Sequence, residues 1–372
     1  MTADPPLLFV PVGRNEARPF GMDARDRACR LATNAGFDCA DEPQPGRAML
    51  LASMRFAWDP AWLKTMRSRP MTMLTLGDEP VMAHVPVDAN LTAAAAGLED
   101  RQVVEDYELL AAETAELNYA ELRKRERPFV MLLDEDNPEA VERAAYDAAY
   151  KGVTDVLTLY LWRRPAFYVT RWAARARIAP NAVTTVGAVL CVLAFFLFWR
   201  GEYWWGVLSG FVFMVLDTVD GKLARVTGAS SKWGEVFDHG IDLVHPPFWY
   251  WAWEHGLLRY GRPLEPVFAT MVLWTIIGGY VAQRLIEGIF IKRLGLEIHV
   301  WRPIDSKFRL ITARRNPNMV ILVVALLFRR PDLGLELVAG WTLASLIFHA
   351  VRLAQANERL GRGQRITSWL EA

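Results

Sequence analysis

Four aspartates lie in or beside apolar stretches of the second half of this chain, namely Asp217, Asp220, Asp238 and Asp242. A carboxylate inside an apolar membrane helix costs on the order of 3 kcal/mol on insertion scales, so a functional role is the first hypothesis. The members of each pair are three or four residues apart and would share one face of a helix. Carboxylates that converge from two helices repel one another unless cations neutralise them, and oxygen ligands suit Mg²⁺ or Mn²⁺. The spacing therefore predicts a divalent metal site.

The residues between the two pairs suit a phosphate ligand. Gly221 and Ala224 are small and leave room for a ligand against the helix, and the guanidinium fork of Arg225 pairs with phosphate oxygens. The alternative is an ion-paired helix hairpin in which Arg225 neutralises one aspartate, but this alternative leaves three acids without an explanation.

The same residues resemble the signature of the class I CDP-alcohol phosphatidyltransferase family. Eight fixed residues within 26 positions match it: Asp217-x2-Asp220-Gly221-x2-Ala224-Arg225-x8-Gly234-x3-Asp238-x3-Asp242. The resemblance covers roughly residues 160–355 and implies an all-α membrane domain of six helices. It also implies a reaction in which a substituted phosphoryl group moves from a CDP-linked donor, such as CDP-diacylglycerol, to an alcohol with release of CMP.

The resemblance further assigns roles by position. Two divalent ions, Mg²⁺ or Mn²⁺, are expected on Asp217, Asp220, Asp238 and Asp242, and Asp242 is also expected to take the proton of the attacking hydroxyl. Contacts with the donor are expected at Gly221, Ala224, Arg225 and Ser231, and at the Pro-Asn-x-x-Thr segment Pro180-Asn181-Ala182-Val183-Thr184. Without the family, this segment is a helix start, because Asn181 can cap a helix and Pro180 ends an earlier one.

A basic cluster, Lys307, Arg309, Arg314 and Arg315, follows the fourth apolar stretch. By resemblance, Arg309, Arg314 and Arg315 are candidates to hold a phosphorylated acceptor, whereas the equally good alternative is the ordinary excess of basic residues on the cytoplasmic side. His239 and His245 flank the acidic helix, and we expect them to be packing or hydrogen-bonding residues rather than metal ligands.

Charge divides the chain into two halves that must position these residues. The 372 residues contain 42 basic and 42 acidic side chains, yet residues 1–160 hold 17 basic and 27 acidic residues and the remainder holds 25 and 15. Net charges of −10 and +10 indicate two regions in different surroundings. Three cysteines at unrelated spacings lead us to expect no disulfide framework and no cysteine zinc site.

Hydropathy favours six membrane spans in the second half. They are Ala182–Trp199 and, approximately, Tyr203–Leu216, Phe237–Trp253, Val267–Ile291, Met319–Phe328 and Leu335–Val351. Nineteen basic residues would flank these spans on one side and five on the other. With no signal peptide at its start, the chain is expected to be a multi-pass protein of the inner (cytoplasmic) membrane with both termini in the cytoplasm. Aromatic and arginine residues interleaved over 160–178 are typical of an interfacial amphipathic helix, with a plain basic flank as the alternative.

The first half alternates between two patterns. Short strands are predicted at Leu7–Val12, Ala48–Ala52, Met71–Leu76, Val81–Val85 and Phe129–Leu133, and helices at Asp23–Ala35, Pro60–Ser68, Val103–Glu121 and Pro138–Lys151. The run Ala93–Ala96 is assigned to a loop or a helix start. This alternation predicts a soluble α/β domain with a largely parallel sheet. The resulting division is a cytosolic domain over 1–158, an interfacial helix and linker over 159–180, the six-span domain over 181–356 and a cytosolic tail over 357–372.

The α/β domain weakly resembles a sugar-phosphate nucleotidyltransferase, of the kind fused ahead of such membrane domains. A working enzyme of that class needs a Gly-rich basic loop and a metal-binding Asp, but this chain offers only Gly13-Arg14-Asn15 after its first strand and Ala52-Ser53-Met54 after a later one. We therefore expect an inactive domain with a scaffolding, regulatory or docking role.

Three functions remain open at this point. The first is a membrane transferase with a CDP-linked lipid donor and a polar or phosphorylated alcohol acceptor, inositol phosphate before glycerol phosphate. The second is a bifunctional enzyme that also makes its donor. The third is a divalent-cation transporter, although the internal repeat common in transporters is not evident. The resemblance implies a homodimer among membrane lipids, and no nucleic acid partner is expected.

Overall fold

The computed structural model describes residues 7–119, 123–230 and 232–371, apart from the side chains of residues 117–119, 232, 233, 235 and 238. The chain forms two compact units. The first, which we call the α/β unit, consists of Met1–Tyr150, Phe167–Pro180 and Gly221–Ser231. The second, the helical unit, consists of Lys151–Ala166, Asn181–Asp220 and Lys232–Ala372.

A six-stranded sheet with the order β2-β1-β3-β6-β5-β7 forms the centre of the α/β unit. Its strands are β1 (Leu8–Val12), β2 (Asp38–Cys39), β3 (Met49–Ser53), β5 (Thr72–Leu76), β6 (Glu79–Val85) and β7 (Glu108–Ala111). Because only β6 is antiparallel to its neighbours, the other five strands share one direction. The prediction of an α/β domain with a largely parallel sheet is confirmed.

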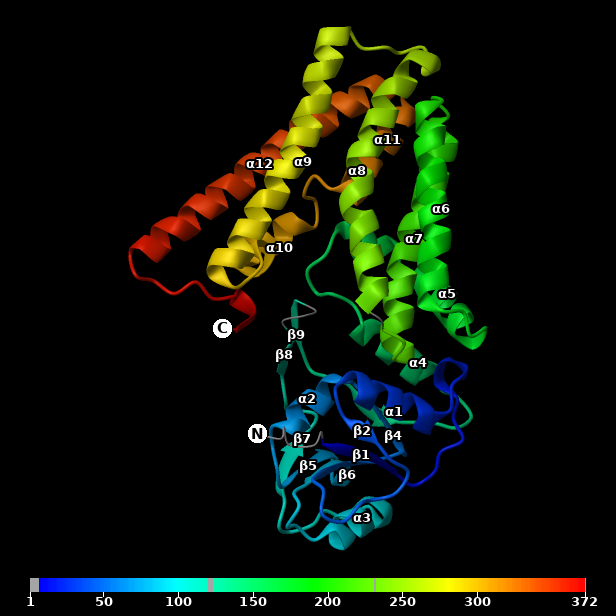
Figure 1. Ribbon diagram of the computed structural model, residues 1–372, viewed down its shortest axis with the longest axis vertical. Coiled ribbons are helices and arrows are strands. Elements are labelled where there is room, and N and C mark those ends of the chain that lie inside the picture. Colours follow the sequence, from blue (N-terminus) through cyan, green and yellow to red (C-terminus); the bar gives the residue numbers. More distant parts are fainter. Residues whose placement is uncertain (1–6, 120–122, 231, 372) are drawn as a thin grey trace. The chain divides into compact units, whose positions relative to one another are not determined.

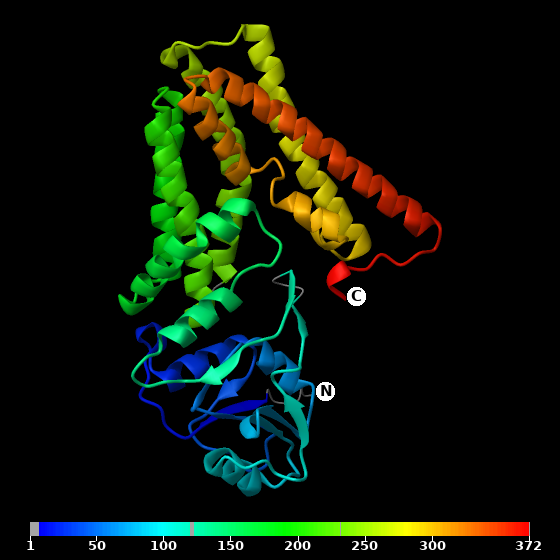
Figure 2. The same cartoon turned by 180° about the vertical axis from the view of Figure 1, so that it is seen from behind.

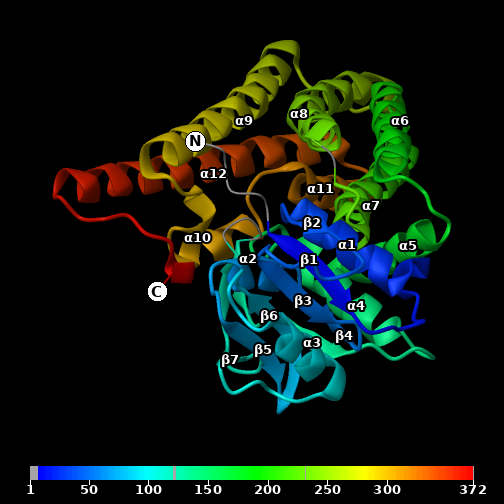
Figure 3. The same cartoon turned by 60° about the horizontal axis from the view of Figure 1, so that its bottom comes forward.

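The two faces of the sheet bury alternate side chains of the same strands. Phe9 and Leu50 lie in the core beneath α1 (Ala24–Asn34) and α2 (Ala61–Arg67). Their neighbours Leu8 and Leu51 lie in the core on the other face, beneath α3 (Leu91–Asp100). Figures 1 and 3 show α1 and α2 on one side of the sheet and α3 on the other. The run Ala93–Ala96 lies in the first half of α3.

The predicted helix over Val103–Glu121 is wrong. This segment contains β7, which pairs in parallel with β5, and β8 (Leu117–Tyr119), which pairs with β9 (Lys124–Glu126). Alanine, glutamate and leucine favour a helix locally, but hydrogen bonding to a preformed sheet edge outweighs that preference. The remaining elements of this unit are β4 (Phe56–Trp58), its partner β10 (Val130–Leu132), the short η1 (Pro19–Gly21) and α4 (Glu139–Ala148).

Two cysteines of the α/β unit are joined, contrary to our expectation. Cys29 of α1 and Cys39 of β2 form a disulfide, with their Cα atoms 5.7 Å apart. The sequence spacing gave no sign of this pair because α1 packs over β1 and β2, and only that packing brings the two residues together.

A helix overlaps each of the six predicted spans. These helices are α6 (Pro180–Trp199), α7 (Tyr203–Thr227), α8 (Lys232–Tyr260), α9 (Pro266–Leu294), α11 (Arg315–Leu327) and α12 (Pro331–Gly361). By length and composition, α6, α9 and α12 are the helices of the described chain that suffice to cross a membrane. The helices α7 and α8 are less apolar, since they contain aspartate, tryptophan and, in α8, histidine and proline, and α11 is a shorter apolar helix.

Five shorter elements complete the described chain. They are η3 (Leu157–Leu161), α5 (Arg163–Arg175), η4 (Ile298–Val300), α10 (Pro303–Arg309) and η5 (Trp369–Glu371). On α5, Tyr168 and Trp172 are four residues apart and both are largely exposed.

Two kinds of packing hold the helical unit together. The helices α6, α7 and α8 run side by side around an aromatic core that includes Phe198, Trp249 and Trp253 (Figures 1 and 2). The helices α9 and α12 pack along each other, and at their contact a Cβ on Gly279 would lie 2.6 Å from Cγ2 of Thr342. Only glycine permits so close an approach of two helices at this position.

Candidate functional site

Two of the predicted aspartates meet on one guanidinium group. Nη2 of Arg315 donates to Oδ2 of Asp217 at 2.7 Å, and Nη1 donates to Oδ1 of Asp242 at 2.8 Å. The two acids come from α7 and α8, and Arg315 is the first residue of α11. The helices therefore place one carboxylate of each predicted pair on a single cation.

The third described aspartate is held by the predicted donor segment. Oγ1 of Thr184, near the start of α6, donates to Oδ2 of Asp220 at 2.7 Å, and both residues are buried. Thr184, Asp217 and Asp220 line one small pocket together with Gly187, Phe213 and Ile241. Of the rest of that segment, Val183 is buried, whereas Asn181 and Ala182 are exposed.

The backbone hydrogen bonding of α8 is interrupted one turn after Asp242. Pro246 and Pro247 lie inside this helix and have no N–H to donate, so the carbonyls four residues earlier lose their helical partner. The hydroxyl of Tyr280 in α9 donates to one of these carbonyls, that of Leu243, at 2.9 Å. His245 packs against Phe213 and Trp249 while its Nδ1 lies 2.6 Å from the carbonyl oxygen of Ile241, in agreement with the packing role predicted for it.

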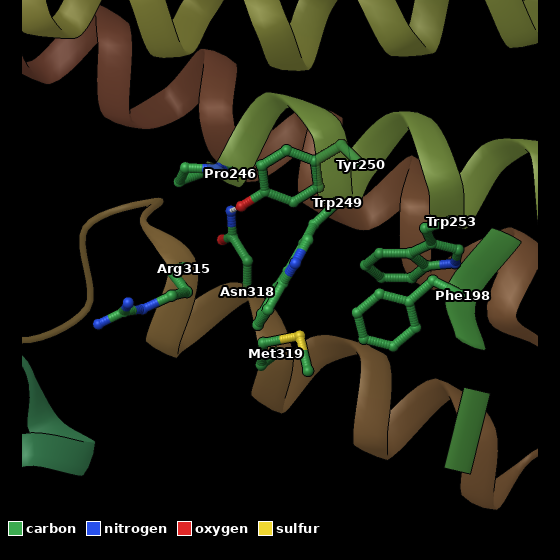
Figure 4. Close-up of a pocket in the computed structure, with 8 residues that line it drawn as sticks. All are labelled: Phe198, Pro246, Trp249, Tyr250, Trp253, Arg315, Asn318 and Met319. Atoms are coloured by element: carbon green, nitrogen blue, oxygen red, sulfur yellow. Dashed lines mark hydrogen bonds between the residues drawn. The ribbon is translucent and has the colours of Figure 1, made fainter. Parts of the chain in front are cut away.

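A set of polar contacts fixes the direction of Arg315. Its Nε donates to Oδ1 of Asn316 at 3.0 Å, and Asn316 in turn donates to Oδ1 of Asp155 at 3.0 Å. Cζ of the Arg315 guanidinium lies over the ring of Phe213, 4.8 Å from the ring centroid. Figure 4 shows the Arg315 side chain pointing away from the aromatic residues of the neighbouring pocket, which include Trp249 and Trp253.

The other predicted donor residues follow Asp220 along α7. Gly221, Ala224 and Arg225 belong to the α/β unit, where Nη1 of Arg225 donates to the carbonyl of Ala149 at 3.3 Å. Pro180 also belongs to that unit. Ser231 and the side chain of Asp238 lie outside the described residues.

The predicted acceptor residues divide between different partners. Arg315 binds the aspartates, whereas Nη2 of Arg314 pairs with Oε1 of Glu287 and lies 3.1 Å from Nε2 of His299. Arg309, the last residue of α10, is buried. Burial is the first cause that lowers the pKa of His299 well below its ordinary value, so this imidazole is neutral near pH 7.

Two groups of side chains offer ligands to a metal ion. The aspartate centre supplies only carboxylate oxygens, which suit Mg²⁺ or Mn²⁺, and it already surrounds a cationic group. A second group, Glu287, His299 and His349, has ligand atoms within 4.8 Å of one another. There, however, Arg284 and Arg314 already pair with the one carboxylate, so a further cation would be repelled.

Several residues of the site were not singled out from the sequence. Asp155, Asn316 and Tyr280 act through contacts between distant segments and carry no local signal. Arg284 and Glu287 did have a signal, since they are oppositely charged residues three apart within an apolar stretch.

Comparisons with known proteins concern the same part of the chain. The family model for CDP-alcohol phosphatidyltransferase matches residues 177–348. An archaetidylinositol phosphate synthase from Pyrococcus horikoshii is 27% identical over 54% of this chain and 95% of its own length. Cholinephosphotransferase 1 from Danio rerio is 31% identical over 29% of this chain, and the chain spans only 30% of that relative.

One solved structure is a more remote match. The crystal structure of phosphatidylinositol phosphate synthase from Mycobacterium tuberculosis with CDP-DAG bound covers 51% of this chain and 94% of its own, at 17% identity and a TM-score of 0.40. The family match and the aspartate motif cover the same part of the chain. Residues 177–348 are therefore a domain of the CDP-alcohol phosphatidyltransferase family.

Proposed function

We propose that this protein is a membrane transferase that moves a substituted phosphoryl group from a CDP-linked lipid, CDP-diacylglycerol first, to a polar alcohol and releases CMP. The observation that carries the proposal is the convergence of Asp217 and Asp242, from two helices, on one cationic group. Such a centre suits divalent cations, and the family match supplies the reaction class.

The carboxylates of Asp217, Asp220, Asp238 and Asp242 would hold two divalent ions, Mg²⁺ or Mn²⁺. When bound, such ions neutralise the diphosphate and stabilise the attacking and leaving oxygens. The bond from Thr184 fixes the orientation of Asp220 from the first turn of α6. Thr184, Gly221 and Arg225 would contact the donor, with the rest of the segment 180–184, Ala224 and Ser231 as the further donor positions.

Asp242 is the proposed base. Its side chain is 46% exposed, whereas that of Asp217 is 16% exposed, so an acceptor hydroxyl reaches Asp242 more easily. A base must lie within hydrogen-bond reach of the proton that it takes. This difference in exposure supports the assignment of the base to the second pair of acids.

Inositol phosphate is the proposed acceptor. The relative from Pyrococcus horikoshii, whose name contains this product class, aligns over nearly all of its length. Arg309, Arg314 and Arg315 supply guanidinium groups for a phosphorylated alcohol. The exposed aromatic residues of α5 support an interfacial position for that helix, and we propose six spans, a homodimer and an inner-membrane location with cytoplasmic termini.

For the α/β domain we propose a scaffolding role at the end of α7. The carbonyls of Val226 and Gly228 accept hydrogen bonds from Arg27 at 3.0 Å and Asn34 at 2.7 Å, and Nζ of Lys222 donates to Ala149 at 2.7 Å. Cations at a helix C-terminus stabilise its unpaired carbonyls. Burial lowers the pKa of Arg27 only to about 10, so this donor remains charged near pH 7.

The test is to incubate the purified full-length protein with Mg²⁺ or Mn²⁺, CDP-diacylglycerol and a panel of alcohols that includes inositol phosphate, glycerol phosphate and choline. CMP release that depends on one acceptor would identify the reaction. No CMP release with any acceptor would contradict the donor assignment, and consumption of CTP by the same protein would support the bifunctional alternative.

A further inference from the structure

The aspartate centre brings three carboxylates close to the guanidinium of Arg315. Arg315 supplies one positive charge to Asp217 and Asp242, and Asp220 adds a third carboxylate that accepts from a neutral hydroxyl. Carboxylates that converge in this way repel one another, and the single charge of one guanidinium offsets part of that repulsion. A divalent ion supplies twice that charge in a smaller volume.

The guanidinium and a metal ion compete for the same oxygens. Nη1 and Nη2 of Arg315 lie 2.8 Å and 2.7 Å from the carboxylates of Asp242 and Asp217. Mg²⁺ binds carboxylate oxygens at about 2.0–2.1 Å, so an ion bridging these acids would take the space that the two nitrogens occupy.

A hydrogen bond at Nε also positions the Arg315 side chain. Asn316 accepts from its Nε, and Asn316 is itself buried and bonded to Asp155 and Thr158. These contacts hold the guanidinium beside the centre without using Nη1 or Nη2. A guanidinium that leaves the acids would therefore remain next to them, with both Nη groups available to an anion.

Resting on the proposed function, we propose that Arg315 is the internal counter-cation of the metal-free aspartate centre. Divalent ions displace it from Asp217 and Asp242, and its fork then becomes available to a phosphate oxygen of a substrate. Arg315 thus keeps the two acid-bearing helices together before the ions arrive, and it links ion loading to anion binding.

Mn²⁺ affinity tests this proposal without any measurement of activity. In detergent-solubilised full-length protein, free Mn²⁺ can be counted from its electron paramagnetic resonance signal during a titration. We expect Arg315→Gln to bind Mn²⁺ about tenfold more tightly than wild type, because two charge-assisted hydrogen bonds no longer compete. Unchanged or weaker Mn²⁺ binding in this variant would overturn the proposal.

Arg330→Gln is the control, since it removes the same charge beyond the other end of α11, where the guanidinium pairs with Asp332. We expect a change of about twofold or less in this variant, owing to solvent screening. Equal tightening in both variants would show a general field effect and would also overturn the proposal.

If Arg315→Gln does not fold, Arg315→Lys decides the question. A single ammonium cannot bridge two carboxylates as a fork does, so an intermediate tightening of about threefold is expected, and none would contradict competition. Wild-type protein that binds no Mn²⁺ would instead refute the ion assignment of the proposed function, on which this proposal rests. Ordinary Mn²⁺ binding without competition refutes only the role of Arg315.

Discussion

In the α/β unit one carboxylate, that of Glu142, binds two guanidinium groups, whereas in the helical unit one guanidinium, that of Arg315, binds two carboxylates. Glu142 is fully buried, accepts from the backbone N–H of Phe20 at 2.7 Å and pairs with Arg171 at 2.6 Å and Arg175 at 3.2 Å. Its negative charge therefore has more partners than it needs.

The opposite arrangement holds around Arg315, where two acids share one guanidinium and the outer acid, Asp242, is 46% exposed. A buried carboxylate whose charge is fully paired avoids the cost of an unpaired buried charge, and removing such a carboxylate is costly. A partly exposed cluster in which two acids share one cation is better suited to binding a further cation. We therefore propose that the cluster around Glu142 is structural and that the cluster around Arg315 is functional.

The largest effect should come from the exposed acid of the functional cluster. Asp242→Asn removes the proposed base, and CMP release should fall by about 10²- to 10⁴-fold, while binding of the CDP-linked donor largely survives. Thermal stability should fall by at most about 1 kcal/mol, because the ion pair that Arg315 loses is half exposed and Arg315 keeps Asp217 as a partner. Full activity in this variant would remove the base assignment, and a marked loss of stability would contradict the contrast between the clusters.

The structural cluster should respond in the opposite way. Glu142→Gln leaves Arg171 and Arg175 beside a neutral amide in a buried site, and we expect the α/β unit to lose about 3–5 kcal/mol of stability. Limited proteolysis of the full-length protein, followed over temperature, would show earlier cleavage within residues 7–150. An unchanged cleavage profile would show that the surplus of donors around Glu142 contributes nothing to folding.

The smallest effect should come from one of the surplus donors. The side chain of Arg175 is 47% exposed, and it shares Glu142 with Arg171 and with the Phe20 N–H. Solvent screening leaves such a pair a contribution of at most about 1 kcal/mol, so Arg175→Ala should shift the same cleavage profile only slightly. A loss as large as that of Glu142→Gln would mean that the donors are not redundant.

Much of the fold followed from local pattern. All five predicted strands and the helices at Asp23–Ala35, Pro60–Ser68 and Pro138–Lys151 match observed elements to within a few residues, because apolar periodicity and caps act over short distances. The helix predicted over Val103–Glu121 was wrong because β7 pairs with β5, whose residues lie 36 positions earlier in the chain, and this pairing decides the conformation. The Cys29–Cys39 disulfide was not predicted for the same reason, since sequence spacing does not show what a helix packs against.

The sequence by itself determined which acids share one face of a helix. The helical period puts residues three and four apart on one face, and apolar flanks made the acids of α7 and α8 conspicuous. It also determined which residues are basic, but not which acid each would bind. Arg314 and Arg315 are adjacent, yet one pairs with Glu287 and the other with Asp217 and Asp242. Arg314 has an extended backbone, whereas Arg315 is the first residue of α11, so the two side chains leave the chain in different directions. The tertiary positions of Glu287 in α9 and of Asp217 and Asp242 in α7 and α8 then decided the partner of each arginine.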